Sequence, residues 1–222
     1  EMDGLKEARE LLKQSLSIRE ELGEKSNIAF SLTSMGNLMQ YQGNYKDAET
    51  HYNNSLNIRK ELDEQPQISG TLHDLGRLAM NKGELDQADV FFSDANEMRK
   101  KMGLIVAQAD TMLHMGRLEV LRDNTSSAEN IFSQSLDLME PDADIKVYAR
   151  TLLHLTILYL DQDDIKKAEK TFDRSGIMKR KWQSPYLDAQ IKALKLRIAT
   201  KKKRDKRVVS KAFNETVTAY DV

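Results

Sequence analysis

The chain has 222 residues, and its 34 Lys and Arg side chains nearly cancel its 35 Asp and Glu side chains, which excludes a strongly basic protein that binds nucleic acid. Cysteine is absent, which excludes disulfides, thiol nucleophiles and thiolate metal sites and favours a reducing, cytoplasmic compartment. The longest nearly apolar stretch, from Leu152 to Leu160, is far shorter than the roughly 20 residues that span a bilayer, so we expect a soluble protein with no membrane contact.

A repeat with a period of 40 residues runs through the chain. Alanine recurs in one column, at Ala8, Ala48, Ala88, Ala128 and Ala168. Two other columns hold glycine (Gly36, Gly76, Gly116) and aromatic side chains (Tyr52, Phe92, Phe132, Phe172). Such self-similarity indicates a repeat architecture in which each unit is one supersecondary element.

Each repeat is predicted to form two amphipathic helices, because its apolar and small residues follow one another at steps of three and four. The chain begins with the second helix of a truncated repeat, over residues 2–22. Four full repeats follow, at about 26–62, 66–102, 105–139 and 144–181. Their first helices are expected at 26–42, 66–82, 105–122 and 144–161, and their second helices at 45–62, 85–102, 125–139 and 165–181. A further first helix at 185–203 completes a repeat domain over residues 1–200, and a capping helix is expected at 204–222.

The predicted breaks inside the repeats consist of residues that tolerate tight turns or cap helices. They are Gly43-Asn44, Gly83-Glu84, Asp123-Asn124 and Asp163-Asp164. The small residues at fixed positions predict a close approach of helix backbones, because packed helix axes lie only about 8–10 Å apart. The aromatic column is expected to fill the gap beside these small residues. Because every repeat is predicted to consist of two helices, the expected fold class is all-α.

The spacing of Leu32, Met35, Gly36, Ala48 and Tyr52 resembles the tetratricopeptide repeat, and the resemblance covers about residues 5–200. The long repeat unit is similar to the variety found in kinesin light chain and in Leu-Gly-Asn repeat proteins. The segments at that tripeptide are Met35-Gly36-Asn37 and Leu75-Gly76-Arg77. This resemblance implies a right-handed superhelical α-solenoid of antiparallel helix hairpins, with a concave groove lined by the first helices.

The resemblance also implies which first-helix side chains point into the groove. The candidate peptide-binding residues are Thr33, Asn37, Gln40, Tyr41, His73, Arg77, Met80, Leu113, Arg117, Leu121, Leu153 and Ile157. These side chains are mostly polar in the first two repeats and mostly apolar in the next two, so the groove is expected to be polar at one end and apolar at the other.

Asn37, Arg77 and Arg117 share one column and are expected to lie roughly 10 Å apart on neighbouring repeats. An extended peptide rises about 3.3 Å per residue, so about every third residue would meet one of them. In the resembling family an asparagine at this position contacts a peptide backbone, which implies that role for Asn37. The two arginines depart from the family pattern and favour an acidic partner. The alternative is that they are solvated or pair with Asp74 or Asp110.

No metal, cofactor or catalytic site is expected from the sequence. The four histidines are His51, His73, His114 and His154, and the last two share a column. Like positions roughly 10 Å apart do not share a zinc ion, whose ligand nitrogens lie about 2.1 Å from the metal. The motifs HExxH, GxxxxGK[ST], GxSxG and GxGxxG are absent from the sequence, so we expect that the protein is not an enzyme.

The run from Lys201 to Arg207 is the strongest concentration of charge in the sequence. We interpret it as a solvated helix end, with a nuclear address, a nucleic-acid contact or a contact with anionic lipid as alternatives.

The sequence favours a noncatalytic interaction scaffold that binds an extended peptide or a partner helix in the concave groove. One alternative is a regulatory or sensor region of a larger multidomain protein. Another is a homo-oligomerisation element, in which the unpaired helix at residues 2–22 offers an open face to a second copy.

Overall fold

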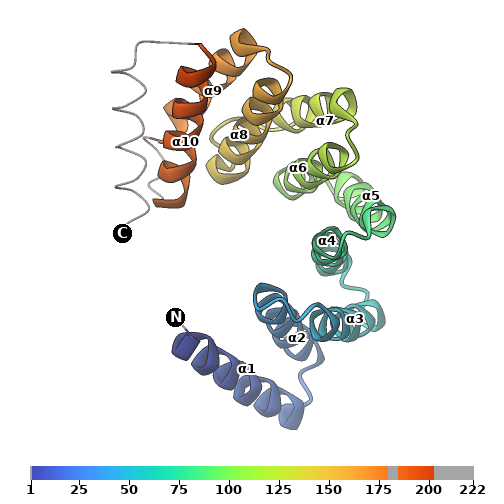
Figure 1. Cartoon of the computed structure of the whole chain (residues 1–222). Coiled ribbons are helices and arrows are strands. Elements are labelled where there is room, and N and C mark those ends of the chain that lie inside the picture. Colours follow the sequence, from blue (N-terminus) through green and yellow to red (C-terminus); the bar gives the residue numbers. More distant parts are fainter. Residues whose placement is uncertain (1, 180–184, 203–222) are drawn as a thin grey trace. The chain divides into compact units, whose positions relative to one another are not determined.

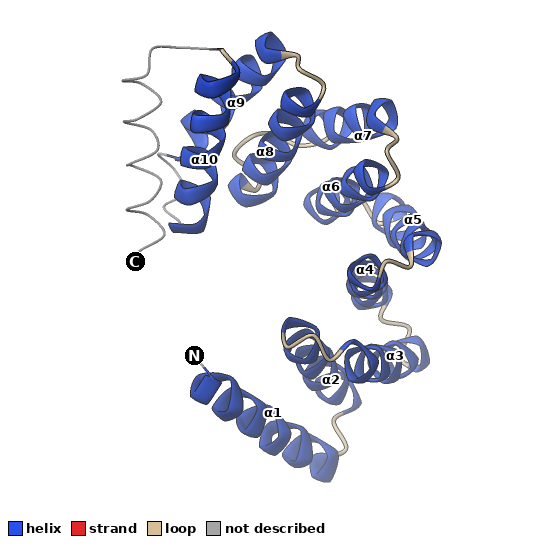
Figure 2. Ribbon diagram, viewed as in Figure 1, coloured by secondary structure: helices blue, strands red, loops and turns tan. Residues whose placement is uncertain are grey.

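The computed structural model describes residues 2–179 and 185–202, and this part of the chain consists of ten α-helices with no strand (Figure 1, Figure 2). The helices are α1 (Met2–Leu22), α2 (Lys25–Tyr41), α3 (Tyr45–Glu61), α4 (Gln65–Lys82), α5 (Leu85–Lys101), α6 (Ile105–Leu121), α7 (Thr125–Asp137), α8 (Ile145–Asp161), α9 (Ile165–Lys179) and α10 (Pro185–Lys201). Their ends lie within two residues of the ranges that the sequence predicts. The capping helix expected at 204–222 lies outside the described residues.

The contacts between helices group the chain into two units, residues 1–104 and 105–222. In the first unit α1 packs on α2, and the hairpins α2–α3 and α4–α5 pack on each other through α3 and α4. In the second unit the hairpins α6–α7 and α8–α9 pack in the same way, and α10 packs on α8 and α9. Each unit is thus built from stacked antiparallel helix hairpins, which is the all-α solenoid arrangement that the sequence predicts.

The helices end in a turn that recurs about every 20 residues and contains one residue with positive φ. These residues are Gly23, Gly43, Asp63, Gly83, Gly103, Asp123 and Asp163. In the turn after α4, the amide of Gly83 donates to Met80 O and the amide of Glu84 donates to Ala79 O, the latter at 2.9 Å. This is the Schellman arrangement, in which a left-handed residue satisfies the last carbonyls of a helix. The turn therefore stops α4 at Lys82 and lets α5 begin at Leu85.

The glycine and aromatic columns meet inside three of the four hairpins. A Cβ atom added to Gly36 would lie 2.6 Å from Tyr52 Cε1, and one added to Gly76 would lie 2.7 Å from Phe92 Cδ1. Both rings are fully buried. The absence of a side chain on the first helix thus creates the space that the aromatic ring of the second helix fills, as the sequence predicts.

A second column, at residues 19 and 59, joins one hairpin to the next. The Arg59 guanidinium, at the end of α3, donates to Gln67 O of α4 at 2.9 Å and to Thr71 Oγ1. Arg19 of α1 makes the equivalent hydrogen bonds to Asn27 O and Ser31 Oγ of α2. Arg59 is buried, and burial lowers the pKa of its guanidinium. We call this contact the arginine clamp, and the sequence analysis did not identify it.

Each unit has its own apolar core, and the larger one surrounds α8 in the second unit. Leu152, Leu153 and Leu160 of this helix are at most 2% exposed. Even so, among the residues that the structure describes, no helix combines the length and the apolar character needed to cross a membrane.

Candidate functional site

The first unit contains a pocket of about 410 Å³ between α2 and α4. Each of its lining residues carries a polar group, and they are Asn37, Gln40, Tyr41, Asp74, Arg77 and Asn81. The α2 residues follow one another within one helical turn, and the α4 residues are spaced at three and four, so each helix presents one face. The structure therefore brings together four of the residues that the sequence analysis chose, Asn37, Gln40, Tyr41 and Arg77.

Tyr52 of α3 contacts the side-chain amides of Asn37 and Gln40 through its hydroxyl. Its hydroxyl lies 2.8 Å from Asn37 Oδ1 and 2.8 Å from Gln40 Oε1. A hydroxyl has one hydrogen, so it donates to one of these oxygens at a time. Burial and the nearby Asp74 raise the pKa of Tyr52, which keeps the hydroxyl protonated as a donor. The phenol thus links the buried core of the hairpin to the orientation of the pocket amides.

Gln40 is only 7% exposed, and its Nε2 atom has no hydrogen-bond partner among the described residues. A buried donor without a partner costs about 1–3 kcal/mol. If the amide is turned over, the nitrogen meets the Tyr52 hydroxyl and the oxygen lacks a partner instead. In both orientations one polar atom of Gln40 is left for a group that enters the pocket.

Asp74 and Arg77 form an ion pair within the pocket, with Arg77 Nη1 3.2 Å from Asp74 Oδ1. Burial raises the pKa of Asp74, while Arg77, Arg99 and Arg59 act in the opposite direction. The Asp74 carboxylate balances the charge of Arg77. The sequence analysis gave this pairing as the alternative to a role for Arg77 in binding an acidic partner. The Arg77 side chain nevertheless remains 40% exposed. Its other N–H groups therefore still reach solvent.

The other predicted residues of the first unit are less available. Thr33 is half-buried, and its hydroxyl donates to Ala29 O at 3.1 Å and lies 2.9 Å from Ser55 Oγ. His73 of α4 is buried edge-on to Phe92, and Arg99 Nη1 lies 3.3 Å from its Nδ1. Met80 is buried. These three side chains support the surface around the pocket but do not line it.

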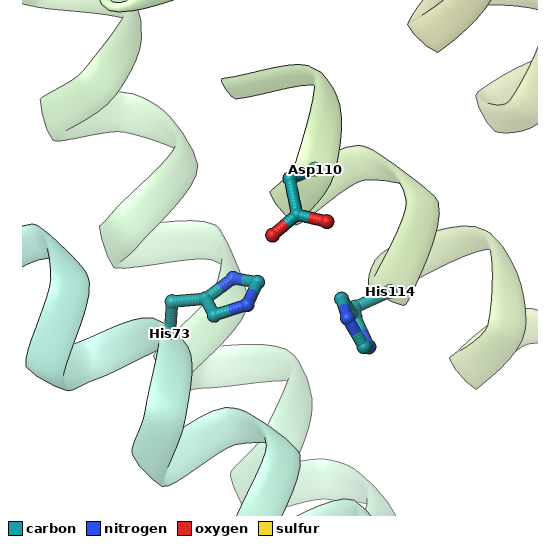
Figure 3. A group of neighbouring side chains, drawn as sticks. All are labelled: His73, Asp110 and His114. Carbon is teal, nitrogen blue, oxygen red and sulfur yellow. The ribbon is translucent and has the colours of Figure 1, made fainter. Parts of the chain in front are cut away.

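In the second unit, arginine side chains of the first helices lie beside histidine and aspartate side chains. Arg117 Nη1 of α6 lies 3.2 Å from His114 Nδ1, and Arg150 of α8 pairs with Asp110 at 3.4 Å. Figure 3 shows Asp110 and His114 on successive turns of α6, and it also shows His73 on α4. Burial, followed by the charges of Arg117 and Arg150, lowers the pKa of His154 to about 4. Two arginines therefore lie near the His154 imidazole on this face.

The apolar residues predicted to line the groove divide into two groups. Leu121 is 56% exposed and Ile157 is half-buried, so both reach the surface. Leu113 and Leu153 are at most 2% exposed and belong to the core of the second unit. These two leucines are thus not part of an open surface. Leu113 and Leu153 share the repeat column of His73, whose side chain is also buried. The sequence already showed that these three residues occupy equivalent positions.

The sequence analysis chose four of the six residues that line this pocket. It gave Asp74 only as a possible partner of Arg77, and it did not choose Tyr52 as a site residue. Tyr52 was assigned only to packing, because its column is otherwise Phe. A hydroxyl in a column of buried phenylalanines is a signal for a polar partner inside the hairpin, and this signal identifies Asn37 and Gln40 as its neighbours.

The comparison with known families finds a match to the tetratricopeptide repeat model over residues 1–61 and 27–101. None of the curated proteins matches the chain in sequence. Among solved structures, BtubC (BKLC) from P. vanneervenii has a TM-score of 0.77 at 16% identity, over 98% of this chain and 88% of that chain.

Two further structures have the same fold. A putative kinesin light chain from Podospora anserina with nearly identical repeats has a TM-score of 0.63 at 15% identity, over 81% of this chain and 89% of that chain. A signal transduction ATPase with a tetratricopeptide repeat sensor, from Pyrococcus horikoshii, has a TM-score of 0.73 at 14% identity over 99% of this chain. The present chain spans only 34% of that ATPase.

Proposed function

We propose that this chain, whose first 101 residues match the tetratricopeptide repeat model, is a noncatalytic interaction module and that the α2–α4 pocket holds an extended segment of a partner protein. Tetratricopeptide repeats generally mediate protein–protein interaction. Solenoids of stacked hairpins offer extended surfaces to such partners. The observation that carries the proposal is the unpartnered amide atom of Gln40, buried at the wall of a polar pocket.

The chemistry of the pocket suits a peptide group. Asn37 and Gln40 carry both donors and acceptors, and a peptide group offers one N–H and one C=O to pair with them. Tyr52 restricts the two side-chain amides before the ligand arrives, so less rotamer entropy is lost on binding. The pocket thus recognises the main chain of a partner, and the side chains of the partner add specificity elsewhere.

The acidic preference expected from the sequence rests on Arg77 and Arg117. Asp74 balances Arg77 in the first unit, so we propose that this pocket accepts a neutral peptide group more readily than a carboxylate. Any preference for an acidic partner then depends on Arg117 and Arg150 in the second unit.

The test is an array of immobilised, extended nine-residue peptides, probed with the purified chain and with variants. Asn37→Ala and Gln40→Ala should each weaken the binding peptides by about 1–3 kcal/mol, since each change removes hydrogen bonds to the ligand. Asn53→Ala is the matched control, because Asn53 is an exposed asparagine of α3 outside the pocket. Peptide affinities that are the same in all three variants and the parent would reject the pocket as the binding site.

A homo-oligomerisation role is the second candidate, and an exposed apolar stripe on α1 favours it. Leu11, Ile18 and Leu22 lie on one face of this helix and are 59%, 57% and 65% exposed. A second copy that covers this stripe would double the mass in solution. Light scattering tests this, and Ile18→Lys should then restore the monomer.

A sensor role, as named for the Pyrococcus horikoshii protein, would instead require that peptide binding changes the activity of an attached domain.

A further inference from the structure

The second unit contains a different pocket, of about 400 Å³, formed by α7, α8 and α9. Its base includes the buried side chains Leu136 of α7 and Leu155 of α8. Its rim includes three cationic side chains of α9, Lys167, Lys170 and Arg174. These follow one another at steps of three and four, so they lie along one face of the helix. The pocket therefore combines an apolar base with a positively charged edge.

The three cations depart from the repeat pattern. Forty residues earlier their columns contain Ser127, Asn130 and Gln134, and eighty residues earlier they contain Gln87, Val90 and Asp94. In the first full repeat the columns contain Asp47, Thr50 and Asn54. No other second helix of a full repeat has a positive charge at any of these positions. Packing of the hairpins thus does not require these cations, since the other hairpins form without them.

The hollow of this pocket also results from a residue that differs from the repeat pattern. Thr171 lies in the column of His51, Phe91 and Ile131, which are all larger side chains. Phe91 packs against the apolar core of the first unit. Thr171 is smaller and leaves open the volume that a larger side chain would fill, although Thr171 is itself only 7% exposed. It lines the pocket.

Interactions within the unit hold two of the cations in place. Lys167 Nζ pairs with Glu129 at 3.0 Å, and it lies 5.0 Å from the centre of the Tyr159 ring. Arg174 Nη2 donates to the Tyr148 hydroxyl at 2.6 Å, and its guanidinium lies 5.9 Å from the centre of that ring. A neutral phenol thus positions Arg174 without neutralising it. Its remaining N–H groups keep the fork geometry that suits a carboxylate.

The charges of the site determine the class of ligand. Glu129 offsets Lys167, and Asp137 at the pocket edge offsets a second cation. The three cations and these two carboxylates together leave one net positive charge. A monoanion matches this balance, whereas a phosphate monoester would bring close to two negative charges.

We propose that this pocket binds a carboxylate that carries an adjacent aliphatic group, such as the C-terminal residue of a partner peptide. Arg174 and Lys170 contact the carboxylate, Thr171 donates a hydrogen bond to it, and the aliphatic group lies on Leu136 and Leu155. The site belongs to the second unit and does not depend on the α2–α4 pocket, so each proposal can fail without the other.

The probe is N-acetyl-L-leucine, added to the isotope-labelled full chain and followed through backbone amide shifts in two-dimensional NMR spectra. Saturable shifts in α7, α8 and α9 are expected, and N-acetyl-L-leucinamide, which lacks the charge, should bind at least tenfold more weakly. Lys170→Gln and Arg174→Gln should each reduce affinity about tenfold. Lys166→Gln, at an exposed lysine of the same helix outside the pocket, should leave affinity unchanged.

Thr171→Phe tests the hollow separately, because it restores the side chain of the equivalent position in the first unit. It should abolish binding while it leaves every charge in place, and a thermal melt establishes that the variant is folded. Equal affinity for the acid and the amide, or unchanged affinity in Lys170→Gln, would overturn the proposal. Saturable shifts with inorganic phosphate and none with N-acetyl-L-leucine would also overturn it and would identify a phosphate site instead.

Discussion

The ring of Phe92 lies so close to the backbone of Gly76 that a Cβ atom at residue 76 would sit 2.7 Å from Phe92 Cδ1. The same relationship joins Gly116 to Phe132, where the corresponding distance is 2.5 Å. These contacts are between two helices of one hairpin, and a fully buried ring has little room to move. The glycine is therefore a packing requirement of the hairpin.

Gly76→Ala should destabilise the protein by about 1–3 kcal/mol, because the added methyl group overpacks the hairpin against the Phe92 ring. Gly70→Ala is the matched control on the same helix, since a Cβ atom there would meet nothing within 4 Å. That change should raise stability by up to about 1 kcal/mol through helix propensity. Chemical denaturation measures both, and equal effects of the two substitutions would contradict the packing explanation.

Arg59→Met should cost about 1–3 kcal/mol of stability, because it removes the arginine clamp and leaves Gln67 O and Thr71 with fewer partners. Lys60→Met, one residue further on at an exposed position, should change stability by less than about 0.5 kcal/mol. Urea unfolding of both variants provides the comparison. If Arg59→Met were as stable as Lys60→Met, the clamp would have no energetic role.

Asp123 has a φ of 60°, a conformation that side chains with a Cβ atom disfavour. Asp123→Ala should lower stability by about 1 kcal/mol, because alanine lacks the local hydrogen bonding with which aspartate tolerates this region. Asp123→Gly should be equal to the parent or slightly more stable. Melting temperatures of the two variants test this order, and the reverse order would show that the turn relaxes away from positive φ.

Protonation of His154 should destabilise the second unit in mildly acidic solution. The folded-state pKa of about 4 lies below the ordinary histidine pKa of 6.5, so the unfolded chain binds this proton more readily between these pH values. The resulting contribution to stability is complete above about pH 6.5 and is lost as pH falls towards 4, by roughly 3 kcal/mol at most.

The measurement compares the parent with His154→Gln by denaturant unfolding at pH 7 and pH 4.5. The loss of stability on acidification should be smaller in the variant, since glutamine does not titrate. The ring also stacks on Phe132 at 6.1 Å, so the substitution has a cost at pH 7 as well. The difference between the two pH values removes that cost from the comparison. A parallel decline in both proteins would show that other groups control acid stability.

The periodic residues made the fold predictable. Repeated alanines, glycines and aromatic residues specify two helices and a turn in each repeat, because small residues and rings pack only at fixed offsets. The arginine clamp was missed, although residues 19 and 59 share the period, because long charged side chains usually lie on solvated surfaces. Its function depends on the carbonyl of the following helix, which the residue types do not reveal.

The candidate site was predicted in part for the same reason. Asn37 and Arg77 were identified by their shared column, but Asp74 and Asn81 lie outside it and reach the pocket through the pairing of α2 with α4. Leu113 and Leu153 show the opposite limit, since periodicity placed them near the groove and the packing of α8 buried them. The pocket of the second unit depends on residues that differ from the rest of their repeat columns, such as Lys170 and Thr171. A search for repeated residues does not find such positions.

The pairing of a glycine with a ring sixteen residues later has a consequence for how the chain reaches its native state. Each such contact closes a short loop, so a hairpin can form early without waiting for distant segments. Proteins dominated by near-neighbour contacts fold quickly, and stacked repeats can begin at any hairpin and spread to adjacent ones. A substitution such as Gly76→Ala should therefore slow nucleation in its own hairpin while leaving the other hairpins as starting points.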